Sequence, residues 1–485
     1  MKSNTFRLHP ASLFLLLSVL VIVAAWLLDV YGVSIYNPQT GDYLRVQSLL
    51  NAEGARWIMR NSITNFSAFP PTAMVVTSLL GIGIAENSGF IDSLSSRFSK
   101  LKYHPKRCLI LMALLGVLSN VVGDAGYVFL VPLLAIMAPR MGIHPVVAIL
   151  VTFVAVACGY SANWMLSSMD PLLARITQDV STSLGIEGFN SGSYSNYFFM
   201  FVSTILITGI IYVISWWVLR RKLEKEGFRL LDEEVRILSH RERRSLNISL
   251  GIGLLFLAVV GWLTFSSLGL FRGVSGELVR SPFIMGALFI LSLSLGIMGF
   301  IYGLNTGKYR NDFDIVKGMS TNIRTLSIYF VIAFFAAQFF AYVSYTRLDQ
   351  FIILFLGQWV QSFELTTPTS LLVVFILYCS AVNLVMVSAV GKWVLISVLF
   401  IPLFAAAGIE PDVVQAAFRI GDSSTNVITP FLYYSPFILA LLNRYVPNVS
   451  FKFIVKHTWY FSLIILLAWT LFFILWYKIS LPFGI

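Results

Sequence analysis

Charged residues are scarce in this sequence. Only 12% of its 485 residues are Asp, Glu, Lys or Arg, whereas 57% are hydrophobic. A soluble protein of this length needs a far larger polar surface, so the composition excludes a soluble globular fold. Apolar stretches long enough to cross about 30 Å of hydrocarbon recur along the chain; clear examples begin at Ala11, Tyr197, Ser249, Phe283 and Tyr460. The alternating pattern of a β-barrel is absent. We therefore predict an all-α polytopic membrane protein.

Cysteine and histidine are also scarce. The three cysteines, Cys108, Cys158 and Cys379, lie in or beside apolar runs, which argues against a disulfide framework. The five histidines do not have the spacing of metal ligands. No Ser/His/Asp grouping, glycine-rich phosphate loop or paired metal carboxylates stand out. We expect no enzymatic activity and no cofactor other than Na⁺, and an intramembrane aspartate acting in catalysis is the least supported alternative.

The net charge of +11 comes from a few loops rather than from the whole chain. Basic residues gather in 97–107, 220–244 and 308–324, which is typical of loops on the cytoplasmic side. Nucleic acid is not needed to explain this charge. Because Lys2 and Arg7 precede the first apolar stretch, we expect a cytoplasmic N-terminus and an uncleaved anchor rather than a signal peptide.

Two regions of the chain share an order of landmarks, which indicates an internal repeat. The first region reads Pro132, Gly142, Pro145, Gly159 and Ser161-Ala-Asn163, and the second reads Pro402, Gly408, Pro411, Gly421 and Ser424-Thr-Asn426. Secondary transporters are often built from inverted repeats whose broken helices meet near the midplane. We predict two membrane halves, residues 1–245 and 246–485.

Polar residues interrupt the apolar runs near 159–170, 383–393 and 419–430. Lipid cannot satisfy free backbone N–H and C=O groups, so a break at membrane depth must face protein or a water-filled cavity. Ser, Thr and Asn favour such breaks because they hydrogen-bond to nearby backbone. We interpret these segments as unwound tips inside the protein. The alternative is a loop at the membrane surface.

Two aspartates are the main candidates for carrying a proton or cation. Asp422 shares a helix face with Arg419, and the alternative to a functional role is a self-neutralising ion pair. Asp170 has no evident local partner except Arg175. Its alternative role is to start a helix at Pro171.

Of four other candidate residues, Asp124 and Trp393 allow two interpretations each. Asp124, between two glycines, suits a third carrier or a structural break equally well. Lys392 is interpreted as a side chain that reaches an interface. Trp393 suits an interfacial aromatic belt or stacking on an aromatic substrate. Glu86 is interpreted as the end of a span.

Three blocks resemble the AbgT family of aminobenzoyl-glutamate transporters: "GYSANWMLSSMDPLLARIT", "AVNLVMVSAVGKW" and above all "QAAFRIGDSSTNVITP". The resemblance extends from about 70 to 442. It implies a homodimeric transporter of the bacterial inner membrane, with nine transmembrane helices and two re-entrant hairpins in each subunit. It also implies uptake of p-aminobenzoyl-glutamate or proton-driven efflux of sulphonamides.

The same resemblance assigns roles to individual residues. The family's functional positions correspond to Asp170, Trp393, Pro411, Arg419, Asp422 and Pro430, and positions near its tips correspond to Asn163, Asn383 and Asn426. Ser424 is a further candidate for substrate binding. One position departs from the family pattern, because Val390 stands where a second serine is usual. A valine cannot make a hydroxyl's hydrogen bond, which leaves the substrate open.

We expect coupling to a proton or another cation gradient through Asp170 and Asp422. The alternative is a sodium-coupled carboxylate transporter in which oxygens near Asn163, Asp170, Asn383 and Asp422 hold Na⁺. A passive channel is a weaker alternative, because a site closed on both sides predicts saturable exchange. Between 107 and 197 the basic loops require an odd number of crossings.

Overall fold

The structure is a computed structural model that describes residues 8–186, 189–231, 236–273, 276, 278, 281–363 and 367–485. The N-terminal helices are α1 (Pro10–Val30), α2 (Ala52–Ser67), α3 (Pro70–Asn87), α4 (Phe90–Arg97), α5 (Pro105–Leu118), α6 (Val131–Met137), α7 (Pro145–Cys158), α8 (Asp170–Ser183), α9 (Tyr197–Ile214) and α10 (Arg220–Lys225). The C-terminal helices are α11 (His240–Phe265), α12 (Pro282–Met285), α13 (Ala287–Thr306), α14 (Asp312–Thr325), α15 (Ser327–Thr346), α16 (Leu348–Gln361), α17 (Pro368–Asn383), α18 (Ala389–Ala406), α19 (Pro411–Ser424), α20 (Ser435–Asn443) and α21 (Phe451–Lys478). Two short strands, β1 (Ser34–Asn37) and β2 (Asp42–Arg45), pair antiparallel.

Within the described residues, nine helices are long and apolar enough to cross a membrane. This confirms the prediction of an all-α polytopic membrane protein. Lys2 and Arg7, on which the expected N-terminal orientation depends, lie outside the described residues. The predicted boundary between the halves, at 245/246, falls inside α11.

The first re-entrant hairpin is formed by α5 and α6. Both of its outer ends lie together, because the Sγ of Cys108, near the start of α5, contacts the carbonyl oxygen of Met141, just beyond α6, at 3.6 Å. The chain reverses at 119–125, where Gly123 has a φ of 61° and a π-helical turn, Gly126–Leu130, follows. This tip contains Asp124, but the sequence prediction did not locate a hairpin tip here.

The second hairpin is formed by α17 and α18. Phe375 of α17 packs against Phe404 at the end of α18, with ring centroids 5.2 Å apart, so the two outer ends are again together. The chain reverses at 384–388, which lies within the break predicted near 383–393. The hydroxyl of Ser388 accepts a hydrogen bond from the N–H of Gly391 and so begins α18.

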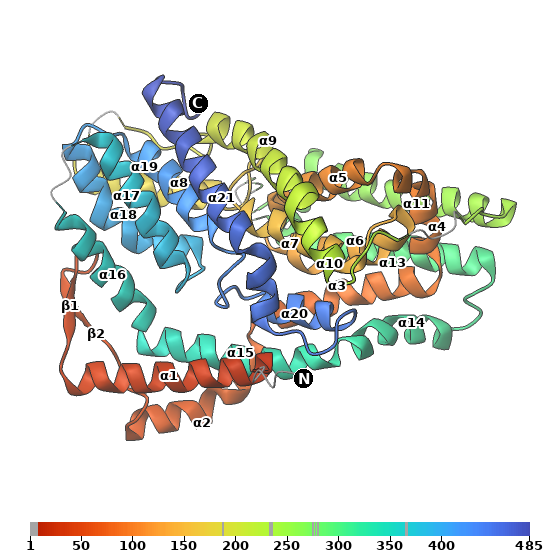
Figure 1. Cartoon of the computed structure of the whole chain (residues 1–485), viewed down its shortest axis with the longest axis horizontal. Helices are drawn as coiled ribbons and strands as arrows, with labels where there is room; N and C mark the ends of the chain where they lie inside the picture. Colours follow the sequence, from red (N-terminus) through yellow and green to blue (C-terminus); the bar gives the residue numbers. More distant parts are fainter. Residues whose placement is uncertain are drawn as a thin grey trace.

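The two hairpins enter from opposite ends of the molecule (Figure 1). The first ends at Gly142, which lies against Lys102 and accepts a hydrogen bond from Leu231; we call this end the basic side. The second ends at Gly408, beside Ser195 and the C-terminal residues; we call this end the opposite side. Each turn has a glycine with φ near 75°. The helix that follows begins with proline at its first turn in both cases, so the landmarks of the repeat mark equivalent, inverted turns.

Each hairpin is followed by a broken helix. The first break, 159–169, separates α7 from α8, as predicted. The second separates α19 from α20 but spans 425–434, so the prediction that unwinding begins near 419 was wrong. Residues 419–424 remain helical, and the hydroxyl of Ser424 stays within the helix by donating to the carbonyl of Ile420.

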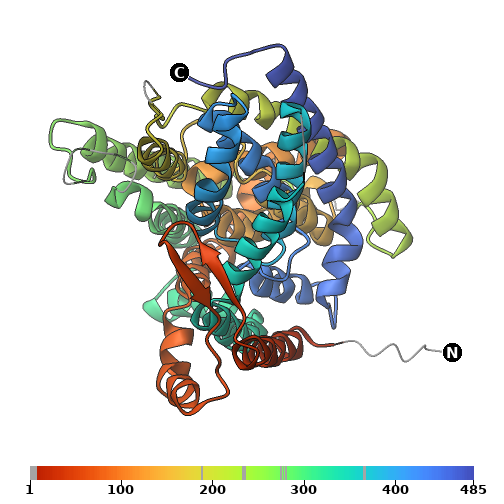
Figure 2. The same ribbon diagram turned by 90° about the vertical axis from the view of Figure 1, so that its left-hand side faces the viewer.

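The remaining helices surround this core. α3 packs along α13 through close glycine contacts, and α1 packs along α15, so N-terminal and C-terminal segments are interleaved. Figure 2 shows β1 and β2 in front of α1 and α2, at the surface of the molecule. Glu86, at the end of α3, forms an ion pair with Arg444 at 2.9 Å, which agrees with its predicted position at the end of a span.

Candidate functional site

Four charged side chains are buried where the two broken helices meet. Arg419 of α19 pairs with Asp170 of α8, and Lys392 of α18 pairs with Asp422 of α19. Their exposed fractions are 2% for Arg419, 7% for Asp170, 0% for Lys392 and 1% for Asp422. Charges at membrane depth are costly unless they are paired, so these two acids and two bases form one neutral unit.

These pairings rule out two alternatives that the sequence left open and give Asp170 a partner that was not expected. Arg419 and Asp422 do not neutralise each other, because each has a partner from another helix. Asp170 does not rely on Arg175, which lies in an exposed ion pair with Asp179. Lys392 does not reach an interface. Its side chain is fully buried, and its charge is paired with that of Asp422.

Asp170 begins α8 and is held from two directions. One carboxylate oxygen pairs with Arg419, and the other accepts hydrogen bonds from the backbone N–H of Ser167 at 2.6 Å and its hydroxyl at 3.0 Å. The alternative that Asp170 caps a helix beginning at Pro171 was wrong, because α8 begins at Asp170 itself and has no side-chain capping hydrogen bond. The contact with Arg419 also connects the break of the first half to the helix of the second.

Asn383 lies at the second hairpin tip and connects it to the second break. Its amide nitrogen donates to the hydroxyl of Thr425 at 3.0 Å and to the side-chain oxygen of Asn426 at 2.9 Å. Its amide oxygen accepts from the ammonium of Lys392. Asn426 in turn donates to the carbonyl of Ala157 at 3.2 Å. Hairpin, second break and α7 are thus joined by one polar network.

The first break and the end of α7 also touch the C-terminal end of α19. The N–H of Ser161 donates to the hydroxyl of Ser423 at 3.2 Å, and the Sγ of Cys158 contacts the carbonyl of Ser424 at 3.7 Å. The unwound backbone therefore faces protein rather than lipid, as the physical argument for these breaks requires. Ser424 contributes its carbonyl to this junction, whereas its hydroxyl bonds within α19.

Trp393 is fully buried, which makes an interfacial aromatic belt wrong for this residue. Its indole N–H donates to the hydroxyl of Thr177 on α8 at 3.0 Å. Its ring lies 4.7 Å from that of Phe418 at an angle of 36°. Gln415 donates to the same hydroxyl at 2.7 Å. A stacking role toward substrate stays a prediction.

Asn163 is buried, and neither its amide oxygen nor its amide nitrogen has a hydrogen-bond partner among the described residues. It lines a cavity of about 10 Å³ with Asp170 and Asn196, whose side-chain oxygen is likewise unpartnered. A space of this size is about what one water requires. Asn196 was not predicted from the sequence, because it lies in a polar loop with no motif around it.

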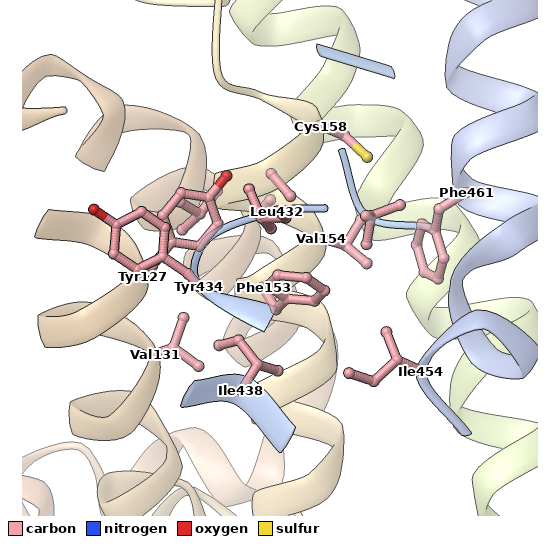
Figure 3. Close-up of a cluster of buried hydrophobic side chains, with 14 of the residues drawn as sticks. Tyr127, Val131, Phe153, Val154, Cys158, Leu432, Tyr434, Ile438, Ile454 and Phe461 are labelled. Carbon is pink, nitrogen blue, oxygen red and sulfur yellow. The ribbon is translucent and has the colours of Figure 1, made fainter. Parts of the chain in front are cut away.

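The first hairpin tip presents an acid without a basic partner among the described residues. Asp124 accepts a hydrogen bond from the hydroxyl of Tyr434 at 3.0 Å. Tyr434 stacks on Tyr127, with centroids 4.8 Å apart and planes 7° apart, inside an apolar cluster that includes Phe153 (Figure 3). Asn120, in the same tip, donates to the carbonyl of Val156 at 3.1 Å. The sequence analysis missed Asn120, although its position matches that of Asn383 in the other tip.

The remaining predicted residues lie around this centre. Pro411 starts α19 at the opposite side, remote from the four charges. Pro430 lies in the second break, next to Thr429, whose hydroxyl donates to the carbonyl of Leu384 at 2.8 Å. Val390 is half-buried in the first turn of α18. Across the described residues, no group of three or more His, Cys, Asp or Glu side chains is placed to hold a metal ion.

Comparisons with known proteins agree with this architecture. The model of the AbgT putative transporter family matches residues 5–485. The p-aminobenzoyl-glutamate transport protein of Escherichia coli is 27% identical over 478 residues, covering 98% of this chain and 93% of that protein. The YdaH transporter of Alcanivorax borkumensis is 30% identical, with a TM-score of 0.54 and coverage of 99% of this chain and 100% of that chain.

A second solved structure is similar to the same extent. MtrF of Neisseria gonorrhoeae, described as illuminating a class of antimetabolite efflux pumps, is 30% identical with a TM-score of 0.52. The match covers 97% of this chain and 96% of that chain. With the family model matching almost the entire sequence, this chain belongs to the AbgT family of transporters.

Proposed function

We propose that this chain is a secondary active transporter of p-aminobenzoyl-glutamate, sulphonamide-type antimetabolites or both, driven by a proton gradient. Asp170 and Asp422 carry the coupling proton. The relatives named for p-aminobenzoyl-glutamate transport and antimetabolite efflux support the substrate class. Arg419, Trp393 and the asparagines of the breaks are the groups proposed to bind substrate.

The observation that carries this proposal is that two buried ion pairs each join different helices. Arg419–Asp170 joins α19 to α8, and Lys392–Asp422 joins the second hairpin to α19. Protonation of either carboxylate removes one attraction that holds these elements together. A change of protonation and a change of access are thereby linked at one place.

Three further features belong to the proposal. The protein resides in the bacterial inner membrane as a homodimer, as the family resemblance implies. The basic side faces the cytoplasm, because its loops are rich in Lys and Arg. Leu8 and Leu13, at the start of α1, line a surface cavity with Glu226 and Lys456 near that side, which supports a cytoplasmic N-terminus.

Sodium coupling is the second candidate. It is favoured by one observation: the unpartnered oxygens of Asn163 and Asn196 face a small cavity together with Asp170. Side-chain oxygens and a carboxylate are the ligands that a hard cation prefers. Of the oxygens that could hold Na⁺ in this candidate, those of Asn383 and Asp422 already bond to Lys392, which favours the cavity at Asn163 over the second break.

Flux measurements in liposomes test both candidates. The purified protein is reconstituted with an imposed pH gradient or an imposed Na⁺ gradient, and uptake of labelled p-aminobenzoyl-glutamate and sulphamethazine is followed. We expect saturable flux that requires the pH gradient. Flux that requires only the Na⁺ gradient would favour sodium coupling, and absence of flux for both compounds would refute the proposed substrates.

Variants locate the coupling groups. Asp170→Asn and Asp422→Asn should abolish flux driven by the pH gradient, because an amide cannot exchange a proton at these positions. Asp179→Asn is the matched control, since Asp179 lies on the same helix as Asp170 but forms an exposed ion pair. Full activity in both Asp170→Asn and Asp422→Asn would contradict the assignment.

A further inference from the structure

Lys392 is the most unusual charged residue of the core. It lies in the first turn of α18, directly after the second hairpin tip, and its side chain is fully buried. Its ammonium contacts the amide oxygen of Asn383 and the carboxylate of Asp422. A buried ammonium needs such partners, because an unpaired charge at this depth is strongly unfavourable.

Asp170, Lys392, Arg419 and Asp422 form a cluster of four buried charges. The two acids of this cluster are held differently. Asp170 receives two hydrogen bonds from Ser167 in addition to its ion pair with Arg419. Among the described residues, the side chain of Asp422 has only one close charged partner, Lys392, and receives no hydrogen bond from a hydroxyl or backbone N–H. Loss of charge on Asp422 therefore leaves Lys392 without its counter-charge.

The cluster as a whole cannot accept an anion while both acids are ionised. Two acids and two bases cancel, so each cation is already neutralised. An anionic substrate needs a cation released from its partner. Lysine suits this role, because its ammonium is a compact charge on a flexible stem.

We propose that Lys392 is the receptor for a carboxylate of the substrate, and that it becomes available when Asp422 takes up a proton. This inference deepens the proposed function and rests on it. A proton from water forms an O–H bond on the carboxylate of Asp422, and Lys392 stays an ammonium. The cluster then carries one positive charge, which one substrate carboxylate neutralises. Binding of an anion and uptake of a proton become one event.

The surroundings of Asp422 identify the groups that share this titration. Arg419 lies on the same helix, Lys392 on α18 and Cys379 on α17. From the first half, the hydroxyls of Tyr127 and Tyr160 are within electrostatic reach. The helices α7 and α21 also pack on α19, but within the described residues they place no charged side chain beside Asp422.

Binding measurements on the full-length protein test this inference. The affinity for p-aminobenzoyl-glutamate is measured against pH, beside that for p-aminobenzamide, which lacks carboxylates. Proton uptake is measured by calorimetry in buffers of different ionisation enthalpy. We expect the affinity for the anion to rise up to about tenfold per unit fall in pH, with one proton taken up. The affinity for the neutral compound should not follow pH.

Variants separate the roles of the two residues. Asp422→Asn should bind the anion with pH-independent affinity, because Lys392 is then always available. Lys392→Gln should lose the preference for the anion over p-aminobenzamide by about tenfold or more, whereas Lys392→Arg should retain it. Lys456→Gln, in a pair with Glu226 at the basic side, is the control and should behave as the original protein does.

The double variant Lys392→Gln with Asp422→Asn guards against misfolding, because it leaves neither charge unpaired. It should fold, bind p-aminobenzamide and show no preference for the anion. Original anion affinity and pH dependence in Lys392→Gln or in the double variant would overturn the inference. Failure of the unmodified protein to bind or transport either class of compound would instead refute the proposed function.

Discussion

The two hairpins occupy equivalent places in the fold but differ in the ionisable side chains at and beside their tips. Each tip has an asparagine that bonds to the broken helix of its own half: Asn120 to the carbonyl of Val156, and Asn383 to Thr425 and Asn426. Yet the first tip presents Asp124 to a neutral tyrosine, whereas Lys392, beyond the second tip, faces Asp422. The repeat therefore gives the two halves the same scaffold, whereas the charged residues differ between them.

Each hairpin also reaches the other half. Asp124 of the first hairpin bonds to Tyr434, where the second break ends, and Trp393 of the second hairpin bonds to Thr177 of α8. Each hairpin is thus hydrogen-bonded to the broken helices of both halves. If this comparison is correct, charge changes at the second tip should have larger effects than changes at the first.

The largest effect is expected when the Lys392–Asp422 pair loses one member. Asp422→Leu leaves a buried ammonium without its counter-charge and should destabilise the protein by about 3–5 kcal/mol. The double variant Lys392→Met with Asp422→Leu should recover most of this loss. Chemical or thermal unfolding in detergent measures both. As the control, Asp179→Ala in the exposed pair with Arg175 should change stability by less than about 1 kcal/mol.

Equal stability of the single and double variants would show that the two side chains do not interact in the folded protein. That outcome would remove the distinction between the two tips.

A smaller effect is expected where α19 packs closely on α17. A Cβ at Gly421 would lie 2.5 Å from the Cβ of Cys379 and 2.7 Å from the carbonyl oxygen of Ile376. Gly421→Ala should therefore push α19 from α17 and cost about 1–3 kcal/mol. Gly209→Ala in α9 is the matched control, because no atom lies within 4 Å of its Cβ position. Equal melting temperatures for both variants would be the contrary result.

The smallest effect is expected at the first tip. Asp124→Asn keeps an oxygen that can accept from Tyr434, so we expect a stability change of about 1 kcal/mol or less. Flux driven by the pH gradient should persist, unlike flux in Asp422→Asn. The same liposome assay checks this, and loss of coupling in Asp124→Asn would make the two tips functionally alike.

Much of this architecture was predictable from local chemistry. Glycine and proline mark the turns at Gly142 and Gly408, and Ser-x-Asn triplets mark the breaks, because these residues act on the adjacent backbone. The onset of the second break was predicted too early, since Gly421 and Ser423 fit within a helix packed closely on its neighbours.

The pairing of charges was not predictable in the same way. Asp170 and Arg419 are 249 positions apart, and Lys392 and Asp422 meet only because the second hairpin folds against α19. Local spacing offered a pair of Arg419 with Asp422 as the alternative to a functional role, and Arg175 as the one evident local partner of Asp170. Neither pair forms. The pairing of acids and bases is set by the tertiary structure, not by spacing along the sequence.

The most direct test of the account is the reversal point of transport. Liposomes are loaded with p-aminobenzoyl-glutamate at fixed internal and external concentrations, and the pH gradient at which net flux stops is determined with the membrane potential clamped. The account predicts that this point shifts by one pH unit for each tenfold change in the substrate ratio, if one proton accompanies each substrate. If the direction of net flux followed the substrate ratio alone, whatever the pH gradient, the account would be contradicted.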